Sequence, residues 1–527
     1  MKMSASPSIF NDVIGPVMRG PSSSHCAAAL RIGRMCRDLM NNELTNIYIE
    51  FDPNGSLATT HKSQGSDMGI FGGFMGWEAY DERLPLSENY LEPNGIFVHI
   101  EIKDIQADHP NTYKLTLSNA NEIHSLTAIS TGGGMIEVID IDQNKVSMTG
   151  DYFETLIYCD NPSHLFPIIL DSISPEFMEF HAGVSCFLEI KTQDLMSKDL
   201  LDKLRQQDGV AKIKIIHPVL PIKARKDMEV PFNNCQEMFE YNEDKNLELW
   251  QLAVKYEAQR GNIAEAEVFE MMRKIVGIMS QSIQTGLKGT HYEDRILGSQ
   301  SLLFQDKLSS HKLLGGDANN LITMYVSAVM EVKSSMGIIV AAPTAGSCGA
   351  LPGAVFGMAH SMNLPEEEIV KALLSAGLIG VFIAKNATFA AEVGGCMAET
   401  GSAGGMAAAA LVGLKGGTLL QAIGAASLAL QNSLGLICDP IGNRVEAPCL
   451  GRNVMAASNA VACANMALSN YAFLIPLDEV IETMKAVGDE IHHTLRCTNL
   501  GGLSVTNAAK KIELNLEAVP TTFYKSC

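Results

Sequence analysis

The sequence predicts a multidomain protein with an N-terminal α+β domain, a small βαβ module in the middle and a large all-α domain in the C-terminal half. Short strand-like runs dominate the first part of the chain, and strand-like and helix-like runs alternate in the next part. Beyond residue 246, hydrophobic residues recur with the 3.6-residue period of helices. A chain of 527 residues is long enough to form several hydrophobic cores.

Residues 1–150 carry the signs of an α+β domain. Strand-like runs such as IYIEF and GIFVHIEIKDI are separated by glycine-rich turns, for example at Phe71-Gly72-Gly73-Phe74 and at Gly132-Gly133-Gly134. The spacing of these runs predicts short strands joined by tight turns.

Residues 151–222 read as strand, helix, strand, helix and strand. The five runs are TLIYCD, PSHLFPIILDSI, SCFLEIKT, LLDKLRQQ and AKIKIIHPV. This order predicts a small split βαβ module. Residues 223–245 are polar and charged, which is typical of a linker between domains.

Residues 246–527 are predicted to be all-α. Runs such as LELWQLAVKYEAQ, EVFEMMRKIVGIMSQSI, EEEIVKALLSAGLIGVFIA and DEVIETMKAVGDEIHHTL have helical periodicity. Alanine-rich runs around residues 407–414 indicate that some helices pack closely.

Two stretches of this half, residues 334–365 and 416–438, contain no Asp, Glu, Lys or Arg and are long enough to raise the possibility of a membrane span. The first is interrupted by prolines and glycines, and the second carries Gln421, Gln431 and Asn432. Both are therefore predicted to be buried helices of a protein that does not enter a membrane.

The composition excludes some partners. Hydrophobic residues make up 46% of the chain and charged residues 19%, and the formal net charge is -20. Nucleic-acid binding needs clustered Lys and Arg, so no nucleic-acid partner is expected. The N-terminal run MKMSASPSIFNDVIG lacks the apolar core of a signal peptide. We expect a cytoplasmic protein, and we expect it to be a homodimer.

Twelve cysteines occur at irregular spacings, which favours reduced thiols and metal ligands over disulfides. Cys396, Cys438 and Cys449 lie in Gly- and Pro-rich turns, and none belongs to a CxxC pair of the kind common in zinc sites. Such turns allow close backbone approach, as iron-sulfur clusters require, although buried packing cysteines are the plainer alternative. Cys527, the last residue, would add a thiolate and an α-carboxylate, which together resemble a small amino acid such as serine.

Five runs resemble the signature segments of the iron-sulfur-dependent L-serine dehydratases, and the resemblance covers nearly the whole chain. Gln64 stands where many members have histidine, and Ala345 where asparagine is frequent. The runs are GPSSSH (Gly20 to His25), GSLATTHKSQGSD (Gly55 to Asp67), AAPTAGSCGALPG (Ala341 to Gly353), EVGGCMAETGSAGGMAAAAL (Glu392 to Leu411) and CDPIGNRVEAPCLGRN (Cys438 to Asn453).

This resemblance implies a lyase that converts L-serine to pyruvate and ammonia with a 4Fe-4S cluster held by Cys396, Cys438 and Cys449. The open iron would act as a Lewis acid, and Cys527 would occupy it in the resting enzyme. The first domain would match the family's β portion, the middle module its ACT-like domain and residues 246–527 its iron-sulfur catalytic α portion.

Candidate catalytic residues are His61, His25 and Lys385, of which His61 is the favoured base because it is the polar residue nearest the Gly-Ser-Leu-Ala turn. The serine-rich run precedes a helical run, so it is predicted to lie at a helix N-terminus, as a substrate site or as a simple N-cap. The candidate substrate-binding residues are Ser22, Ser23, Ser24, His25, Thr344, Ala345, Gly346, Ser347 and Asn453.

Three alternatives stay open. The same chemistry could act on L-threonine, L-cysteine or another β-substituted amino acid, because one methyl group gives only ~1 to 3 kcal/mol of discrimination. A pyridoxal-phosphate lyase could use Gly401-Ser402-Ala403-Gly404-Gly405 as a phosphate loop and Lys385 as the Schiff base. A non-catalytic sensor could combine an iron-sulfur cluster with an amino-acid-binding module.

Overall fold

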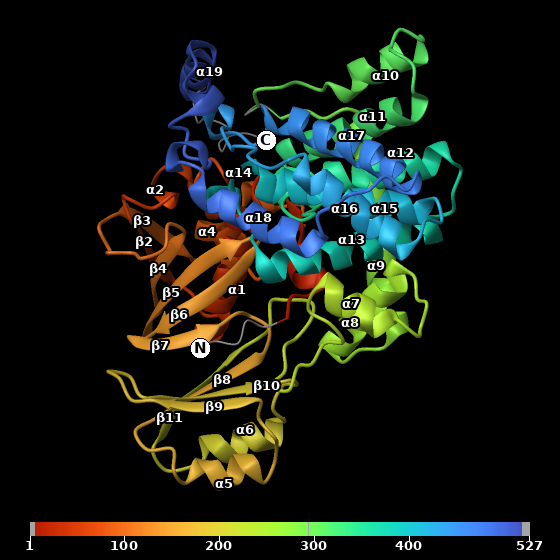
Figure 1. Ribbon diagram of the computed structural model, residues 1–527. Coiled ribbons are helices and arrows are strands. Elements are labelled where there is room, and N and C mark those ends of the chain that lie inside the picture. The colour runs from red at the N-terminus through yellow and green to blue at the C-terminus, as the bar shows by residue number, and fades with distance from the viewer. Residues whose placement is uncertain (1–5, 293–294, 519–527) are drawn as a thin grey trace. The chain divides into compact units, whose positions relative to one another are not determined.

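A computed structural model of the chain describes residues 6–292 and 295–518. Its contacts divide the chain into two compact units (Figure 1). The sheet unit comprises residues 24–228, and the helical unit comprises residues 1–23 together with 229–527. The predicted combination of an N-terminal region with sheets and helices and a largely helical C-terminal part is confirmed. The finer boundaries at residues 150, 222 and 245 stay predictions, and Cys527 lies outside the described residues.

The first sheet of the sheet unit has six strands in the order β3-β2-β4-β5-β6-β7. Strands β2 and β3 are parallel, and the other neighbours are antiparallel, so the sheet is mixed. The strands are β2 (Asn46–Phe51), β3 (Phe97–Ile102), β4 (Thr112–Ser118), β5 (Ile123–Gly132), β6 (Met135–Ile141) and β7 (Asn144–Met148).

Helices α1 (Ala28–Leu39) and α3 (Ser66–Phe74) pack tightly against each other, and α1 also contacts β5 and β6. Glycines permit this approach: a Cβ atom at Gly73 would collide with the backbone of Leu30, and one at Gly69 with the backbone of Cys26. The short helices α2 (Leu57–Thr60) and α4 (Glu88–Leu91) complete this part of the sheet unit.

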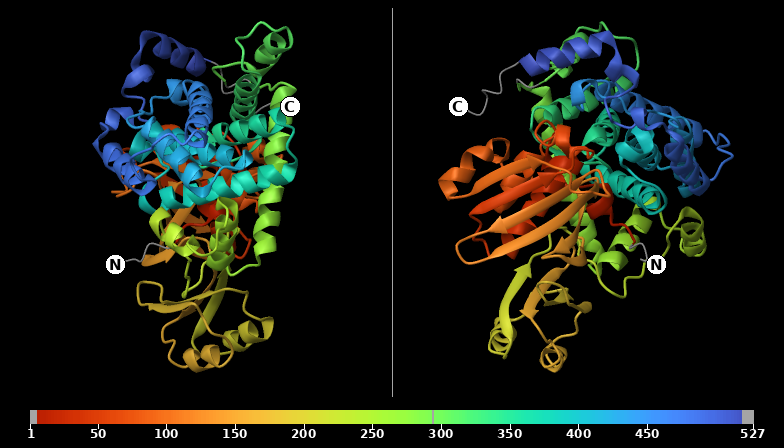
Figure 2. Two further views of the ribbon diagram at one scale, coloured as in Figure 1. Left: turned by 45° about the vertical axis from the view of Figure 1, so that its right-hand side comes forward. Right: turned by 90° about the vertical axis from the view of Figure 1, so that its left-hand side faces the viewer.

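The second sheet has the strand order β11-β8-β10-β9, and its elements follow the order β-α-β-β-α-β of ferredoxin-like modules (Figure 1). Figure 2 shows this module, in gold and yellow, from two further sides. The reading as five elements was wrong, because it missed β9. This strand lies at the sheet edge, pairs with β10 alone among the described strands and has no fully buried residue. The elements are β8 (Phe153–Cys159), α5 (Leu165–Leu170), β9 (Phe177–His181), β10 (Phe187–Thr192), α6 (Lys198–Arg205) and β11 (Val210–Ile216).

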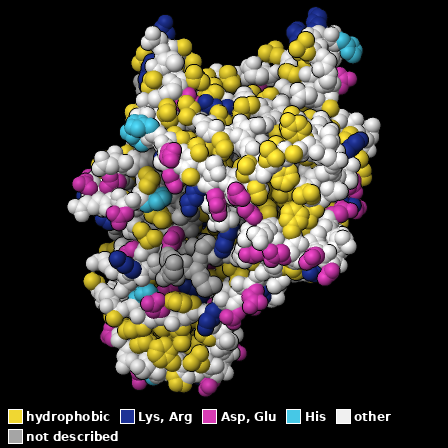
Figure 3. Space-filling model, in the orientation of Figure 1, with side chains coloured by type: hydrophobic (Ala, Val, Ile, Leu, Met, Phe, Trp, Pro, Cys, Tyr) yellow, Lys and Arg dark blue, Asp and Glu magenta, His cyan; other side chains and the backbone are white. Residues whose placement is uncertain are grey.

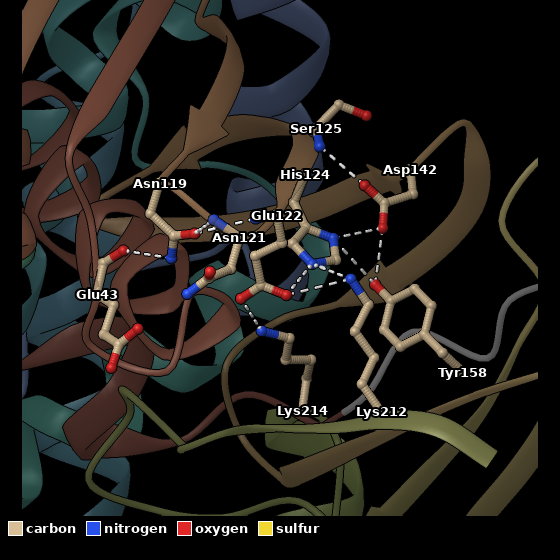
Figure 4. Close-up of polar contacts among 10 residues, drawn as sticks. All are labelled: Glu43, Asn119, Asn121, Glu122, His124, Ser125, Asp142, Tyr158, Lys212 and Lys214. Atoms are coloured by element: carbon tan, nitrogen blue, oxygen red, sulfur yellow. Dashed lines mark hydrogen bonds and ion pairs between the residues drawn. The ribbon is translucent and has the colours of Figure 1, made fainter.

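A network of buried and partly buried charged and polar side chains joins the two sheets of this unit (Figure 4). His124 contacts Asp142 at 2.6 Å, the hydroxyl of Tyr158 donates to Asp142 at 2.7 Å, and the ammonium group of Lys212 lies 2.9 Å from Nε2 of His124. Lys212 and Lys214 both donate to Glu122. We call these residues the charge network: Glu122, His124, Asp142, Tyr158, Lys212 and Lys214.

The positive and negative side chains of the charge network bond to one another. Burial alone would raise the pKa of Glu122, but the hydrogen bonds from Lys214 and Lys212 outweigh it and lower this pKa to about 2. Burial raises the pKa of Tyr158, and the neighbouring Asp142 carboxylate raises it further. Acid and base side chains of one unit therefore neutralise each other inside it.

The helical unit contains long helices and one small two-stranded ladder. Its main elements are β1 (Val17–Arg19), α7 (Cys235–Asn242), α8 (Leu249–Gly261), α9 (Glu265–Leu287), α10 (Ser301–Ser309), α11 (Asp317–Ser334), β12 (Ile338–Val340), α12 (Ala350–Ser361), α13 (Glu366–Asn386), α14 (Ala391–Cys396), α15 (Ser402–Leu414), α16 (Leu419–Gln431), α17 (Cys449–Leu468), α18 (Leu477–Glu490) and α19 (Asn507–Ala518).

Helix α15 lies in the interior of this unit, where it packs against α12, α13, α16 and α17. Twelve of its residues are buried, and its small side chains allow the neighbours to approach. The prediction that the charge-free stretches form buried helices is confirmed by α12 and α16. Within residues 6–292 and 295–518, no helix combines the length and the hydropathy needed to cross a bilayer.

The first residues of the chain belong to the helical unit, which the sequence did not indicate. Ile9–Val13 form a π-helical turn against α13, and the amide of Ile9 donates to the buried Glu257 at 2.8 Å. Strand β1 then pairs with β12 in antiparallel register. This ladder holds the start of the serine-rich run beside α11, because Gly20 packs against the backbone of Lys333.

Some large apolar side chains of the helical unit are exposed. Leu420 on α16 and Tyr471, Leu474 and Ile475 in the loop before α18 are each more than a third exposed. Figure 3 shows hydrophobic side chains gathered over this part of the drawn face. The homodimer expected from the sequence stays a prediction.

Candidate active site

The backbone around Cys396 is bent so that its thiol faces a second cysteine segment. Gly395 has a φ of +69°, and a Cβ atom there would lie 2.8 Å from the carbonyl oxygen of Leu436, so this position requires glycine. The amide of Met397 donates to the same carbonyl at 3.0 Å. The bend therefore brings the end of α14 to the residues that lead into Cys438.

Hydrogen bonds from Arg452 and from the amide of Leu503 hold the segment of Cys438. The Arg452 guanidinium donates to the carbonyl of Ile437 at 2.9 Å and to the carboxylate of Asp439 at 2.6 Å. The other oxygen of Asp439 accepts from the amide of Leu503 at 2.7 Å. Arg452 thus orients the cysteine loop.

Cys396, Cys438 and Cys449 lie close together. Cys396 and Cys438 belong to one buried apolar cluster, and electrostatic coupling links each of the three thiols to the other two. We call these three residues the cysteine site. Among the described residues, no three His, Cys, Asp or Glu side chains are arranged to hold a single metal ion.

Three thiolates form a donor set that both zinc sites and iron-sulfur clusters use, with different spacing of the sulfurs. A single zinc ion needs all sulfurs about 2.3 Å from one point. A 4Fe-4S cluster instead takes its thiolates on separate irons, so the sulfurs stand farther apart. Burial raises the pKa of Cys396 to about 11 and raises that of Cys449 further, so a bound metal must displace thiol protons.

The run Thr344 to Ser347 forms a capped turn that leads into α12. The amide of Ser347 donates to the hydroxyl of Thr344, and the amide of Thr344 donates to the hydroxyl of Ser347, each at 3.3 Å. The amide of Ala345 donates to the hydroxyl of Ser23 at 3.4 Å. This contact brings the serine-rich run to the same turn.

Asn453 links this turn to the cysteine site. Its side-chain amide donates to the carbonyls of Gly346 and Cys449, each at 2.9 Å, and its oxygen accepts from the amide of Ala350 at 3.0 Å. Asn453 is fully buried, so these bonds satisfy it inside the protein. Asn453 therefore connects the turn to Cys449, the first residue of α17.

Two charged side chains that the sequence reading missed lie near the cysteine site. The hydroxyl of Thr344 donates to the carboxylate of Glu399, whose pKa is raised to about 7, mainly by burial. Lys333 is fully buried and donates to the carbonyl of Val445, and burial lowers its pKa. Glu399 lies three residues after Cys396 in one of the five quoted runs, so the sequence could have identified it as a candidate site residue. Lys333 lies outside these runs, so no sequence pattern indicated it.

The serine-rich run becomes helical earlier than predicted. A π-helical turn covers Ser23–Ala27, directly before α1, whose N-cap residue Ala27 has no side-chain cap. Ser22 precedes this turn, and Ser23 and Ser24 lie within it, so the hydroxyls do not cap α1. The two readings of this run, as a substrate site or as an N-cap of the helical segment, stay predictions.

The two candidate histidines of the sheet unit differ in environment. His25 is 2% exposed, its Nε2 lies 3.1 Å from the hydroxyl of Thr60, and burial lowers its pKa to about 4. His61 is partly exposed, and its Nδ1 lies 2.7 Å from the carboxylate of Asp67. His61 is therefore oriented by a carboxylate, whereas His25 is held neutral in the interior.

The other candidates have simpler positions. Lys385 is half-buried in the last turn of α13. Gly401 to Gly405, the phosphate loop of the pyridoxal-phosphate alternative, are buried helical residues at the start of α15. A buried helix does not offer the open glycine loop that this alternative needs.

Comparison with known proteins assigns the class of this chain. A family model described as "Serine dehydratase alpha chain" matches residues 244–504, which contain the whole cysteine site. The "Probable L-serine dehydratase, alpha chain" of Bacillus subtilis (strain 168) is 36% identical over 282 residues, covering 54% of this chain and 94% of that protein.

Two longer relatives extend the match to the sheet unit. The "L-serine dehydratase" of Helicobacter pylori (strain ATCC 700392 / 26695) is 26% identical over 499 residues, covering 92% of this chain and 96% of that protein. The "L-serine dehydratase" of Streptomyces coelicolor is 27% identical over 505 residues, with the same coverage of 92% and 96%. The chain belongs to the L-serine dehydratase family, and the resemblance seen in its motifs is confirmed.

Proposed function

We propose that this chain is an L-serine ammonia-lyase that holds a 4Fe-4S cluster at Cys396, Cys438 and Cys449. The observation that carries the proposal is the convergence of three cysteines from separate segments into one buried site, in a chain that matches L-serine dehydratases over 92% of its length. When bound, the cluster would supply a Lewis acid for the departing hydroxyl group. Cys527 as a resting fourth ligand stays a prediction.

The turn at Thr344 and the serine-rich run are proposed to hold the substrate carboxylate. Hydroxyl and amide groups gather there, and Asn453 fixes the turn to Cys449. Glu399 accepts from Thr344 and thereby orients the hydroxyl of that residue. Serine's carboxylate would accept hydrogen bonds from this turn, which orients the Cα-H bond and the β-hydroxyl.

His61 is the proposed base. Because Nδ1 of its ring donates to Asp67, Nε2 carries the lone pair and can take the proton from Cα of serine. Loss of that proton and of the β-hydroxyl gives aminoacrylate and water. The aminoacrylate tautomerises to an imine, which water hydrolyses to pyruvate and ammonia. His25 is the weaker candidate, because burial lowers its pKa to about 4.

The module of residues 151–222 is proposed to be ACT-like, and its β-α-β-β-α-β order supports this. The cytoplasmic location also stays a prediction.

Anaerobic turnover tests the proposed function. The full-length chain, purified without oxygen, is expected to form pyruvate and ammonia from L-serine in equal amounts. A parallel panel with L-threonine and L-cysteine ranks the substrates. A chain that contains iron and sulfide but forms no keto acid from any of these amino acids would contradict the enzyme and favour the sensor.

A further inference from the structure

A fourth cysteine, Cys497, lies beside the cysteine site. Its segment runs next to that of Cys438: the amide of Cys438 donates to the carbonyl of Leu495 at 2.9 Å, and the amide of Cys497 donates to the carbonyl of Cys438 at 2.8 Å. Cys438 and Arg496 form a parallel bridge pair. Cys497 also packs against the buried cluster that contains Cys396 and Cys438.

The two side chains meet. A hydrogen bond between the thiols of Cys438 and Cys497 is the largest cause that raises the pKa of Cys438. The amide-to-carbonyl bond of 2.8 Å limits the distance between the two Cα atoms to less than about 7 Å, which is within the reach of a disulfide. The pair therefore needs little backbone movement to form a covalent bond.

Hydrogen bonds hold the segment of Cys497 both before and after this residue. The Arg496 guanidinium donates to the carbonyl of Ile491 at 2.6 Å and to that of Asp489 at 2.5 Å. Asp439, next to Cys438, accepts from the amide of Leu503. Cys497 itself has a φ of +62°, a conformation that costs energy for a residue with a side chain and persists only where the surroundings enforce it.

We infer that Cys438 and Cys497 are a modification site, at which an intramolecular disulfide forms when no cluster is bound. Cys497 is half-buried and Cys438 is 5% exposed, so a small disulfide such as oxidised glutathione meets Cys497 first. The Cys497 thiol loses its proton and attacks one sulfur of the reagent, which releases one glutathione. Cys438 then loses its proton, attacks the Cys497 sulfur and releases the second glutathione.

The bond would change what the chain can bind. A sulfur of Cys438 in a disulfide cannot serve as a thiolate ligand, so the oxidised chain should accept no cluster until it is reduced. This consequence rests on the proposed function, whereas formation of the disulfide does not.

Tryptic peptide mapping tests the pair, because trypsin places the four cysteines on four different peptides. Lys415, Arg444, Arg452 and Arg496 separate them, so that Cys438 falls on residues 416–444 and Cys497 on residues 497–510. The full chain is stripped of metal with a chelator under argon and treated with a small excess of oxidised glutathione. Free thiols are then blocked with N-ethylmaleimide before digestion without reductant.

The expected result is a dominant cross-linked pair of peptides 416–444 and 497–510, lighter by two hydrogens than the separate peptides. A Cys438 found mainly blocked, or linked mainly to Cys396 or Cys449, would overturn the inference. So would a glutathione adduct that persists on Cys497 beside a blocked Cys438.

A variant pair tests the consequence with iron and sulfide content as the readout. After oxidation, the wild-type chain should take up iron and sulfide only when dithiothreitol is added, whereas C497S should take them up without it. C463S is the matched control, since Cys463 is a buried thiol of α17 that contacts Asn432 and should behave as wild type. Equal uptake by oxidised wild type and C497S would contradict the consequence. No uptake by any reduced chain would instead reject the proposed function, while the peptide map would still decide the disulfide.

Discussion

The charge network of the sheet unit and the cysteine site of the helical unit both bury polar side chains, but they satisfy them differently. In the charge network, Lys212 and Lys214 neutralise Glu122, and His124 and Tyr158 bond to Asp142 (Figure 4). In the cysteine site, three buried thiols lie near one another. In the first arrangement the charged groups are neutralised by members of the same network, whereas the second is the proposed site of a bound cluster.

This difference predicts that the two regions fail in different ways. Removing a member of the charge network should cost stability and leave the chemistry in place. Removing a member of the cysteine site should cost the cofactor and the chemistry.

The largest effect is expected for C438S. A serine hydroxyl does not replace a thiolate ligand, so the variant should lose most of its iron and sulfide and all measurable turnover of L-serine. Iron, acid-labile sulfide and anaerobic pyruvate formation are measured on the same preparation. C463S, with its buried thiol on the same helix as Cys449, should match wild type. A C438S variant with wild-type iron content would contradict the assignment of Cys438 as a cluster ligand.

The next effect concerns the proposed base. H61Q keeps a polar side chain but removes the proton acceptor, so kcat should fall by about 10² to 10⁴ while KM changes little. D67N should lower kcat by less, because it leaves the imidazole in place and removes only the carboxylate 2.7 Å from it. An H61Q variant with unchanged kcat would transfer the role of base to another residue.

A smaller effect is expected in the charge network. K214M removes a fully buried ammonium group that donates to Glu122, and should lower the free energy of unfolding of the sheet unit by about 1.5 to 3 kcal/mol. Trp77 reports on this unit in a W250F background, because Trp77 and Trp250 are the two tryptophans of the chain and Trp250 lies in the helical unit. Urea unfolding is followed by the fluorescence of Trp77.

R205A is the control for this variant. It removes an ion pair with Asp202 whose two side chains are nearly half exposed, so unfolding should change by less than ~0.5 kcal/mol. If K214M and R205A unfold alike, the charge network does not stabilise the unit.

The smallest effect is a pH dependence in the same network. The pKa of Glu122 is about 2 in the folded chain, below its ordinary value of 4.5. Its contribution to stability is therefore complete above about pH 4.5 and is lost as the pH falls toward 2. E122Q should be less stable than wild type at pH 6, and the difference should shrink as the pH is lowered from 4.5. A difference that grows on acidification would reverse the assigned sign.

The sequence predicted more of the fold than of the site's surroundings. Helical periods located α8, α9, α13 and α18, because such patterns are local. The edge strand β9 was missed because it buries nothing fully, and the place of residues 9–13 against α13 was missed because it depends on contacts far apart in the sequence.

The candidate site follows the same rule. The motifs around Cys396, Cys438 and Cys449 could be recognised, since each lies in a short run of characteristic residues. Cys497 lies four residues before the pair Gly501-Gly502, a weaker signal of this kind that was not used. The contacts of Lys333 and Asn453 form only when α11, α12 and α17 pack together, so no local sequence pattern predicts these contacts.

Iron and acid-labile sulfide in the anaerobically purified full-length chain test the central claim most directly. The account predicts close to four iron and four sulfide per chain, lost together in C396S, C438S and C449S and kept in C463S. A wild-type chain that turns over L-serine without iron or sulfide, or that holds them equally well after these three substitutions, would contradict it.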